Sequence, residues 1–231
     1  MSDTTVELRS APRPVYKPQT LQCPQCTGLL ERLSEHSQLI VCPYCNERLE
    51  LTQAELRALG KEDIPEFDQF TLPLNSSFVW EDITYTIIGR MSYLDEDGSP
   101  AQKDYLLFHP EFGTLWATEY WGYGYYVTRR SRMPVPTGIL DGTVRSITTS
   151  DGVKWTLSER ETYTLEYVDG ALPWVAKQGD QVELIELKDS SRVQFSMSIE
   201  RTLGVDELEC SISQQLHKKQ WKKATGQYTQ T

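Results

Sequence analysis

Four cysteines in two short pairs constrain the fold of this chain more than any other feature of its sequence. Their spacing is Cys23-x2-Cys26-x15-Cys42-x2-Cys45, and a proline follows the first cysteine of each pair. Proline fixes one backbone torsion, so each pair favours a tight turn that points two sulfur atoms at one place. Two such turns supply the four thiolates of a closed, tetrahedral zinc site. The sequence therefore predicts that residues 21–50 form a zinc ribbon around one structural Zn²⁺.

Other uses of these cysteines fit the sequence less well. An iron centre of the rubredoxin type also takes four sulfur ligands in a tetrahedron. A redox Cys-x-x-Cys pair needs no second copy, and disulfides require an oxidising compartment. The N-terminus has no apolar signal core, so we expect a cytoplasmic location and reduced cysteines. Four thiolates leave no open metal position, so we expect His36 at the surface, and the distant Cys210 is typical of a small buried hydrophobe.

The remaining chain is divided by its composition. The first 20 residues contain three prolines and no periodicity, which predicts an extended arm. After the cysteines, Leu51–Gly60 is predicted as a short helix, because Thr52 and Glu55 form a capping box and a glycine ends the segment. The predicted segments are a flexible arm (1–20), the zinc ribbon (21–50), the short helix and a linker (51–69), an all-β domain (70–224) and a disordered tail (225–231).

The long segment after the linker has the pattern of β-structure. From Phe70 to about Ser213, short runs rich in β-branched and aromatic residues alternate with turn signals such as Asp97-Gly98. About ten short strands at this spacing indicate an antiparallel sandwich or barrel-like domain. Residues Gln214–Ala224 follow as a short basic helix. The predicted fold class is therefore mainly β, with a small zinc ribbon before the larger domain.

The charge is uneven along the chain. The net charge is −10, yet the last segment carries Lys218, Lys219, Lys222 and Lys223 without an acidic residue. The excess of acid therefore lies in the middle of the chain and in the ribbon. Acidic surfaces repel phosphate backbones, which argues against nucleic-acid binding. Binding of nucleic acid through the ribbon and the basic termini is kept as an alternative hypothesis.

The sequence gives no clear catalytic signature. The three histidines are far apart in the chain, and there is no phosphate-binding glycine loop. The chain is therefore expected to be a non-catalytic protein. Charges on strands usually face solvent. The alternative is an enzyme or small-molecule binder that uses carboxylates in a pocket, with raised pKa values as its mark. The candidate carboxylates are Glu119, Glu161, Glu166 and Glu200.

An aromatic segment provides the candidate binding surface. Gly122 and Gly124 interrupt a run of tyrosine and tryptophan within FGTLWATEYWGYGYYVTRR. Such a hairpin presents aromatic side chains to a partner, or it fills the core of the sheet with them. In the basic C-terminal helix, a tryptophan either inserts at an anionic membrane surface or docks the helix on the β domain. The candidate surface residues are Trp121, Tyr123, Tyr125 and Trp221.

The order of these features resembles the domain-of-unknown-function family 4178 over residues 70–223. The resemblance is carried by the strand ITYTIIGR with Gly89, by the aromatic hairpin, by ALPWVAKQGDQVELIEL with Trp174, and by SIERTLGVDELECSISQQL. The resemblance implies a bacterial protein with no residue-by-residue activity to transfer. It also implies a cytoplasmic accessory role in a membrane-stress-associated assembly, with possible peripheral contact to the membrane. The hypothesis is therefore a non-catalytic, zinc-containing binding or adaptor protein with a protein partner.

Overall fold

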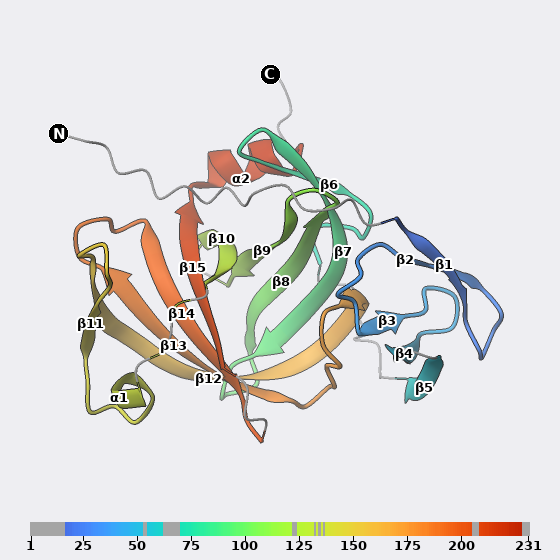
Figure 1. The fold of residues 1–231 in the computed structure, drawn as a ribbon, viewed down its shortest axis with the longest axis horizontal. Coiled ribbons are helices and arrows are strands. Elements are labelled where there is room, and N and C mark those ends of the chain that lie inside the picture. Colours follow the sequence, from blue (N-terminus) through green and yellow to red (C-terminus); the bar gives the residue numbers. More distant parts are fainter. Residues whose placement is uncertain are drawn as a thin grey trace.

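The structure is a computed structural model that describes most of the chain. The described residues are 17–52, 55–61, 70–121, 124–131, 133, 135, 137–204 and 208–227. Most of the predicted arm, most of the linker, Tyr123 and the end of the tail lie outside the described residues. Strands dominate the described part, and two short helices accompany them (Figure 1).

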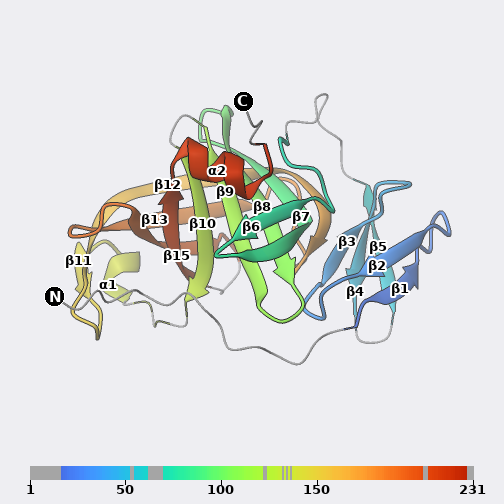
Figure 2. The same ribbon diagram turned by 90° about the horizontal axis from the view of Figure 1, so that it is seen from above.

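The cysteines lie in a small module of five short strands at one side of the molecule (Figure 2). One hairpin joins β1 (Gln19–Gln22) to β2 (Leu29–Arg32), and its turn carries the first cysteine pair. A second hairpin joins β3 (Leu39–Val41) to β4 (Glu47–Leu51), and its turn carries the second pair. β5 (Leu56–Lys61) pairs with β4. This arrangement agrees with the predicted zinc ribbon.

Two predictions about the edges of this module are wrong. The predicted arm extends to residue 20, yet residues from Gln19 onward already pair in β1. The predicted helix over residues 51–60 is a strand, because the Thr52 hydroxyl accepts a hydrogen bond from Glu55 N at 3.1 Å and closes a turn. The same two residues that suggest a capping box therefore build a hairpin. A helix of about ten residues is marginal by itself, and pairing with β4 outweighs it.

The main domain is a closed antiparallel barrel (Figure 1). Starting from the longest strand, the order is β12, β13, β14, β15, β10, β9, β8 and β7, and β7 pairs with β12 to close the ring. The prediction of an antiparallel sandwich or barrel-like domain is confirmed, and the closed ring makes it a barrel. The strands are β7 (Ile83–Leu94), β8 (Pro100–His109), β9 (Gly113–Tyr120), β10 (Gly124–Ser131), β12 (Lys154–Leu172), β13 (Gln181–Asp189), β14 (Phe195–Thr202) and β15 (Leu208–Leu216).

Strand β12 connects the barrel to the cysteine module. It is 19 residues long, and its last residues, Ala171 and Leu172, pair with β3. β7 passes close to this junction, and a Cβ at Gly89 would lie 2.2 Å from the backbone oxygen of Ala171. Only glycine fits there. The module is also held by Arg48, whose Nη1 donates to the backbone oxygen of Ala176 at 2.9 Å.

The two outer faces of the barrel carry most of its apolar cores. One face is covered by β6 (Ser77–Trp80) and α2 (Lys218–Ala224), and the other by α1 (Thr137–Leu140) and β11 (Ser146–Thr148). Cys210 is buried in the second of these cores, as predicted. Because side chains alternate along a strand, the residues between these apolar ones face the lumen. The lumen is consequently polar in part, and a further apolar core, which includes Met91 and Tyr93, reaches into it.

The C-terminal helix is shorter than predicted. Residues Gln214–Leu216 still belong to β15, and α2 begins at Lys218. Cross-strand pairing with Tyr125–Val127 extends β15 to Leu216, which accounts for the later start. In the described part of the chain, neither helix is long and apolar enough to span a lipid bilayer.

Candidate functional site

The first candidate site is the four-cysteine cluster. Its Sγ atoms all lie within 4.8 Å of one another, so the group is able to hold a metal ion. Cys23 Sγ lies 3.8 Å from Cys45 Sγ, and Cys26 Sγ lies 3.6 Å from Cys42 Sγ. A tetrahedron with metal–sulfur bonds of about 2.3 Å has edges of about 3.8 Å. The spacing of the four sulfurs therefore fits a tetrahedral thiolate site.

The local backbone prepares the sulfurs for a metal. In each pair a tight turn closes by a backbone hydrogen bond, from Thr27 N to Cys23 O at 2.9 Å and from Asn46 N to Cys42 O at 2.8 Å. Burial raises the pKa of the Cys23 thiol, but hydrogen bonds from nearby backbone N–H groups outweigh it and lower this pKa to about 7. His36 is exposed, as predicted, and is not part of the cluster.

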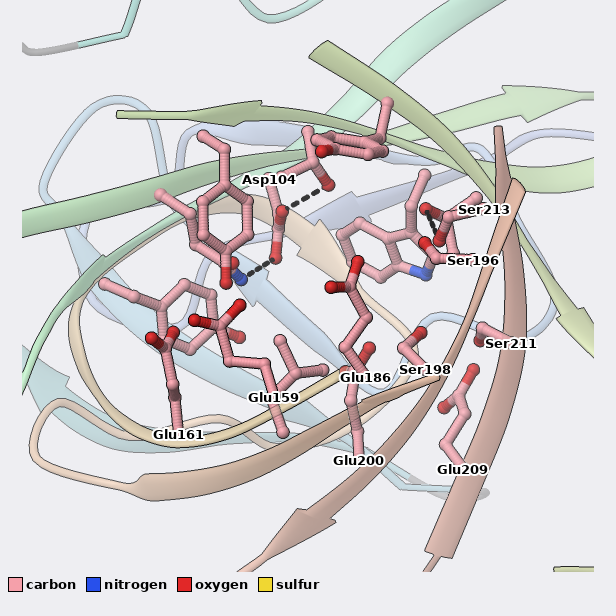
Figure 3. A pocket seen from close by; sticks show the side chains of 18 of the residues that line it. Asp104, Glu159, Glu161, Glu186, Ser196, Ser198, Glu200, Glu209, Ser211 and Ser213 are labelled. Carbon is pink, nitrogen blue, oxygen red and sulfur yellow. Dashed lines mark hydrogen bonds between the residues drawn. The ribbon is translucent and has the colours of Figure 1, made fainter. Parts of the chain in front are cut away.

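The second candidate site is a cavity of about 130 Å³ inside the barrel (Figure 3). All eight strands of the ring contribute to its wall, together with Trp174 from the loop after β12. Its lining contains one lysine, Lys188, and six carboxylates. The carboxylates are Asp104, Glu159, Glu161, Glu186, Glu200 and Glu209.

A β-bulge turns two of these carboxylates into the lumen. The register of β12 against β13 shifts between Leu157, which is opposite Leu187, and Glu159, which is opposite Glu186. Leu157 belongs to the outer apolar face, whereas Glu159 and Glu161 line the cavity. Without the extra residue in the strand, both glutamates would continue the outward series. Bulges commonly serve to redirect side chains in this way.

Two pairs of carboxylates lie directly opposite each other on neighbouring strands. Glu159 is opposite Glu186 on β12 and β13, and Glu200 is opposite Glu209 on β14 and β15. Like charges at such positions destabilise a sheet. Lys188 Nζ lies 3.1 Å from Glu186, and Arg130 Nε lies 3.6 Å from Glu209. These two cations offset only part of the negative charge in the lumen.

Burial raises the pKa values of three lumen carboxyls, and repulsion by neighbouring carboxylates adds to this for two of them. Burial, followed by the charges of Asp104 and Glu209, raises the pKa of Glu200 to about 8. Burial, followed by a hydrogen bond and repulsion from Glu159, raises the pKa of Glu161 to about 7. Burial also raises the pKa of Asp104 to about 6, although two side chains donate hydrogen bonds to it. The lumen is thus an environment that disfavours uncompensated negative charge.

Two serine hydroxyls complete the polar wall. Ser211 is 2% exposed and Ser196 is 7% exposed, and both line the cavity. Their hydroxyls form no side-chain hydrogen bond with the part of the chain that the structure describes, in contrast to Ser213, which bonds Thr128 at 2.8 Å. Buried hydroxyls normally have a partner. These two groups are therefore available to a bound molecule.

Aromatic side chains line the same cavity. Trp116 and Trp174 lie with ring centroids 5.7 Å apart, and Tyr120 and Tyr126 meet edge to face at 6.2 Å. The Tyr163 hydroxyl, beside Tyr120, donates to Glu161. The wall therefore combines carboxylates with aromatic faces. This combination is typical of sites that recognise organic cations.

The structure brings together half of the carboxylates proposed from the sequence. Glu161 and Glu200 share the cavity. Glu119 and Glu166 lie outside it and accept hydrogen bonds from Tyr105 at 2.8 Å and from Ser92 at 2.9 Å. The other four cavity carboxylates were not proposed from the sequence. The alternation of polar and apolar residues, as in SMSIE and ECSIS, indicates strands whose polar side chains share one face. The missed residues are Asp104, Glu159, Glu186 and Glu209.

The predicted aromatic surface is only partly a surface. Trp121 is 65% exposed, and Lys103 Nζ lies 5.9 Å above its ring. Trp221 is 2% exposed, and Tyr125 stacks on it at 4.6 Å. The prediction that Trp221 belongs to a binding surface is wrong, because its ring is buried where it docks α2 on the barrel. Tyr125 is half-buried, so its place in a binding surface stays a prediction. Tyr123 lies outside the described residues.

Comparison with known proteins identifies the main domain. Residues 74–218 match a family model described as domain of unknown function (DUF4178). The matched span covers the ring of eight strands and ends at Lys218, the first residue of α2. No curated protein and no solved structure matches this chain.

Proposed function

The chain belongs to the family described as domain of unknown function (DUF4178), and from the geometry of its barrel we propose that this domain binds a small organic cation. The observation that carries the proposal is the charge of the lumen. Six carboxylates and a single lysine line one cavity. A buried carboxylate is costly unless a positive group or hydrogen-bond donors compensate it. A bound cation would supply that compensation.

The arrangement of the carboxylates favours an organic cation over a metal ion. Among the described residues, the four cysteines are the group of three or more His, Cys, Asp and Glu side chains placed to hold a metal. The lumen carboxylates are instead distributed over β8, β12, β13, β14 and β15. A spread of acceptors suits a molecule with an extended body. The aromatic rings of Trp116 and Trp174 offer faces for alkylammonium groups.

The volume limits the size of the ligand. A cavity of about 130 Å³ is close to the ~150 Å³ of an engineered apolar cavity that binds benzene. The ligand is therefore a molecule of a few carbon atoms. Neither histidine nor cysteine lines this cavity. Binding, rather than a reaction that needs a cysteine nucleophile or a histidine base, is consequently the function that the lumen supports best.

The cysteine cluster supports a structural role for a zinc ion. Four thiolates complete a tetrahedron and leave no position for substrate. A module of about 30 residues has too little core to fold by itself, so metal binding would supply folding free energy. Because β3 pairs with the end of β12, the folded module would also anchor one side of the barrel. A protein partner for this chain stays a prediction, and the exposed Trp121 is the described residue that favours it.

A titration with three matched compounds tests the proposal. Isothermal calorimetry would compare a straight-chain primary amine with the alcohol and the carboxylic acid of the same length. We expect the amine to bind and the alcohol and acid to show no measurable heat. The Glu161→Gln and Glu200→Gln variants should bind the amine more weakly than the unmodified protein. Glu96→Gln, on an exposed turn, should bind it equally well. Equal binding of amine and alcohol would show that the carboxylates do not select the ligand.

A further inference from the structure

The lumen carboxylates form two groups, and this division goes beyond a general preference for cations. The first group lies on β12 and β13, where Glu159 and Glu186 are direct cross-strand partners and Glu161 lies two residues along β12. In the second group, Glu200 and Glu209 are direct partners on β14 and β15. Asp104 on β8 also lines the cavity, and we count it with the second group because its charge acts on Glu200.

Electrostatic coupling follows the same division. The pKa of Glu161 is raised by burial, by Glu159 and by Glu186. The pKa of Glu200 is raised by burial, by Asp104 and by Glu209. In each group, two carboxylates therefore repel a third, which is Glu161 in the first group and Glu200 in the second. One cation can relieve the repulsion in one group, but a second cation is needed for the other.

The two groups differ in position. Glu159 is exposed at the mouth of the cavity, and Lys188 beside it is exposed as well. In the close view of the lumen, Glu159 and Glu161 lie to one side of Glu200 and Glu209 (Figure 3). The strand pairs β12–β13 and β14–β15 are offset by two strand spacings, about 10 Å along the sheet. Because the side chains point into the lumen, two cationic groups bound by them would be closer together than about 10 Å.

A row of serines runs from the first group onto the two strands that carry the second. The register places Glu186, Ser198 and Ser211 in this row across β13, β14 and β15. Ser211 is 2% exposed and lines the cavity, and its hydroxyl has no side-chain partner in the described chain. This second, independent feature points to a bound molecule rather than to a purely acidic cluster. A protonated amino group has three N–H donors and can use a carboxylate and a hydroxyl together.

We propose that the ligand is a linear dication with two separated protonated amino groups. Asp104, Glu200 and Glu209 hold one amino group, and Glu159, Glu161 and Glu186 hold the other. The aliphatic chain between the amino groups lies against Trp116 and Trp174. This inference rests on the proposed function, because it assigns the number of charges to a ligand that the proposed function describes only as a cation.

The test compares a straight-chain diamine with the monoamine of the same length. Isothermal calorimetry would measure both compounds on the full chain and on Glu161→Gln, Glu200→Gln and Glu96→Gln. In the unmodified protein we expect the diamine to bind at least about tenfold more tightly, since it makes a second set of charge-assisted hydrogen bonds. In Glu161→Gln and in Glu200→Gln this preference should fall to about onefold. In Glu96→Gln it should persist.

The possible results separate the two proposals. A preference for the diamine that collapses in both lumen variants supports two subsites. Equal affinity of diamine and monoamine, or a preference that survives in both variants, overturns the dication while a cation site stands. Absence of binding for every amine overturns both proposals. Thermal unfolding of each variant verifies folding, and neutralising one of several repelling carboxylates should not lower stability.

Discussion

Glu200 on β14 lies directly opposite Glu209 on β15, and both side chains face the same lumen. Such a pair is unfavourable in an empty barrel, because like charges opposite each other destabilise a sheet. Protonation reduces the repulsion between the two carboxylates, since burial and neighbouring charges raise the pKa of Glu200 to about 8. Under the proposed function, a bound cation and a proton would compete for the same groups.

The first prediction concerns stability as a function of pH. Glu200 is faced by Asp104 from β8 and by Glu209 from β15, and its own charge raises the pKa of Tyr93 on β7. Its folded pKa of about 8 exceeds the ordinary glutamate value, so the folded state retains a proton that the unfolded state has released. The stability that Glu200 contributes should be fully present below the ordinary glutamate pKa and be lost as the pH rises through about 8.

Urea denaturation at several pH values measures this dependence. Glu161 and Asp104 have raised pKa values too, so they act in the same direction over the lower part of the range. Glu200→Gln should flatten the curve, and at about pH 9 it should raise the free energy of unfolding by about 0.2 to 1 kcal/mol. Glu96→Gln serves as the control. A stability that increases steadily from pH 5 to pH 8 would contradict the prediction.

The second prediction concerns protons released on binding. An amine that keeps its charge until about pH 10 requires ionised carboxylates. At pH 7 the raised pKa of Glu200 means that binding must displace a proton. Amine affinity should therefore increase between about pH 6 and pH 8. Calorimetry in buffers with different ionisation heats measures the released protons, and Glu200→Gln should release fewer. An affinity independent of pH would contradict the prediction.

The third prediction concerns the cysteine cluster. Cys42→Ser removes one of four ligands, so elemental analysis should find about one zinc ion per unmodified chain and much less in the variant. The N-terminal module should then unfold, which amide hydrogen exchange would detect as lost protection in β3 and β4. Cys210→Ser is the matched control, because Cys210 lies in the barrel core and not in the cluster. Equal zinc content in the two variants would contradict the assignment.

The fourth prediction concerns the C-terminal helix. Trp221 is buried among Phe78, Tyr105 and Tyr125, whereas Trp121 is exposed. Trp221→Ala should therefore lower the free energy of unfolding by about 3 to 5 kcal/mol. Trp121→Ala should change it by no more than about 0.5 kcal/mol. Urea denaturation of both variants provides the comparison, and similar stabilities would argue against docking of α2 by Trp221.

Local chemistry made part of this structure predictable from the sequence. Cys23, Cys26, Cys42 and Cys45 are brought together by two short turns, and each turn is specified by residues beside it. The β content of the main domain follows from the residue types and the turn signals. These local predictions agree with the structure, whereas the helix predicted from Thr52 and Glu55 does not.

Long-range pairing determined what the sequence did not reveal. The segment at residues 56–61 is a strand because β4 lies beside it. The direction of the lumen carboxylates depends on the closure of the ring between β7 and β12, which no local pattern specifies. The alternation of polar and apolar residues along a strand does not show whether its apolar face lies inside the barrel or under a covering helix. Here α1 and α2 cover outer apolar faces, so Glu161 and Glu200 point inward rather than to solvent.

A crystal structure of the chain with a bound straight-chain amine would test the central claim most directly. The account predicts the ammonium nitrogen inside the barrel, within about 3 Å of a carboxylate oxygen of Glu161 or Glu200. It also predicts the aliphatic chain beside Trp116 and Trp174. An amine bound only on the outer surface, with no density for it in the lumen, would contradict the account.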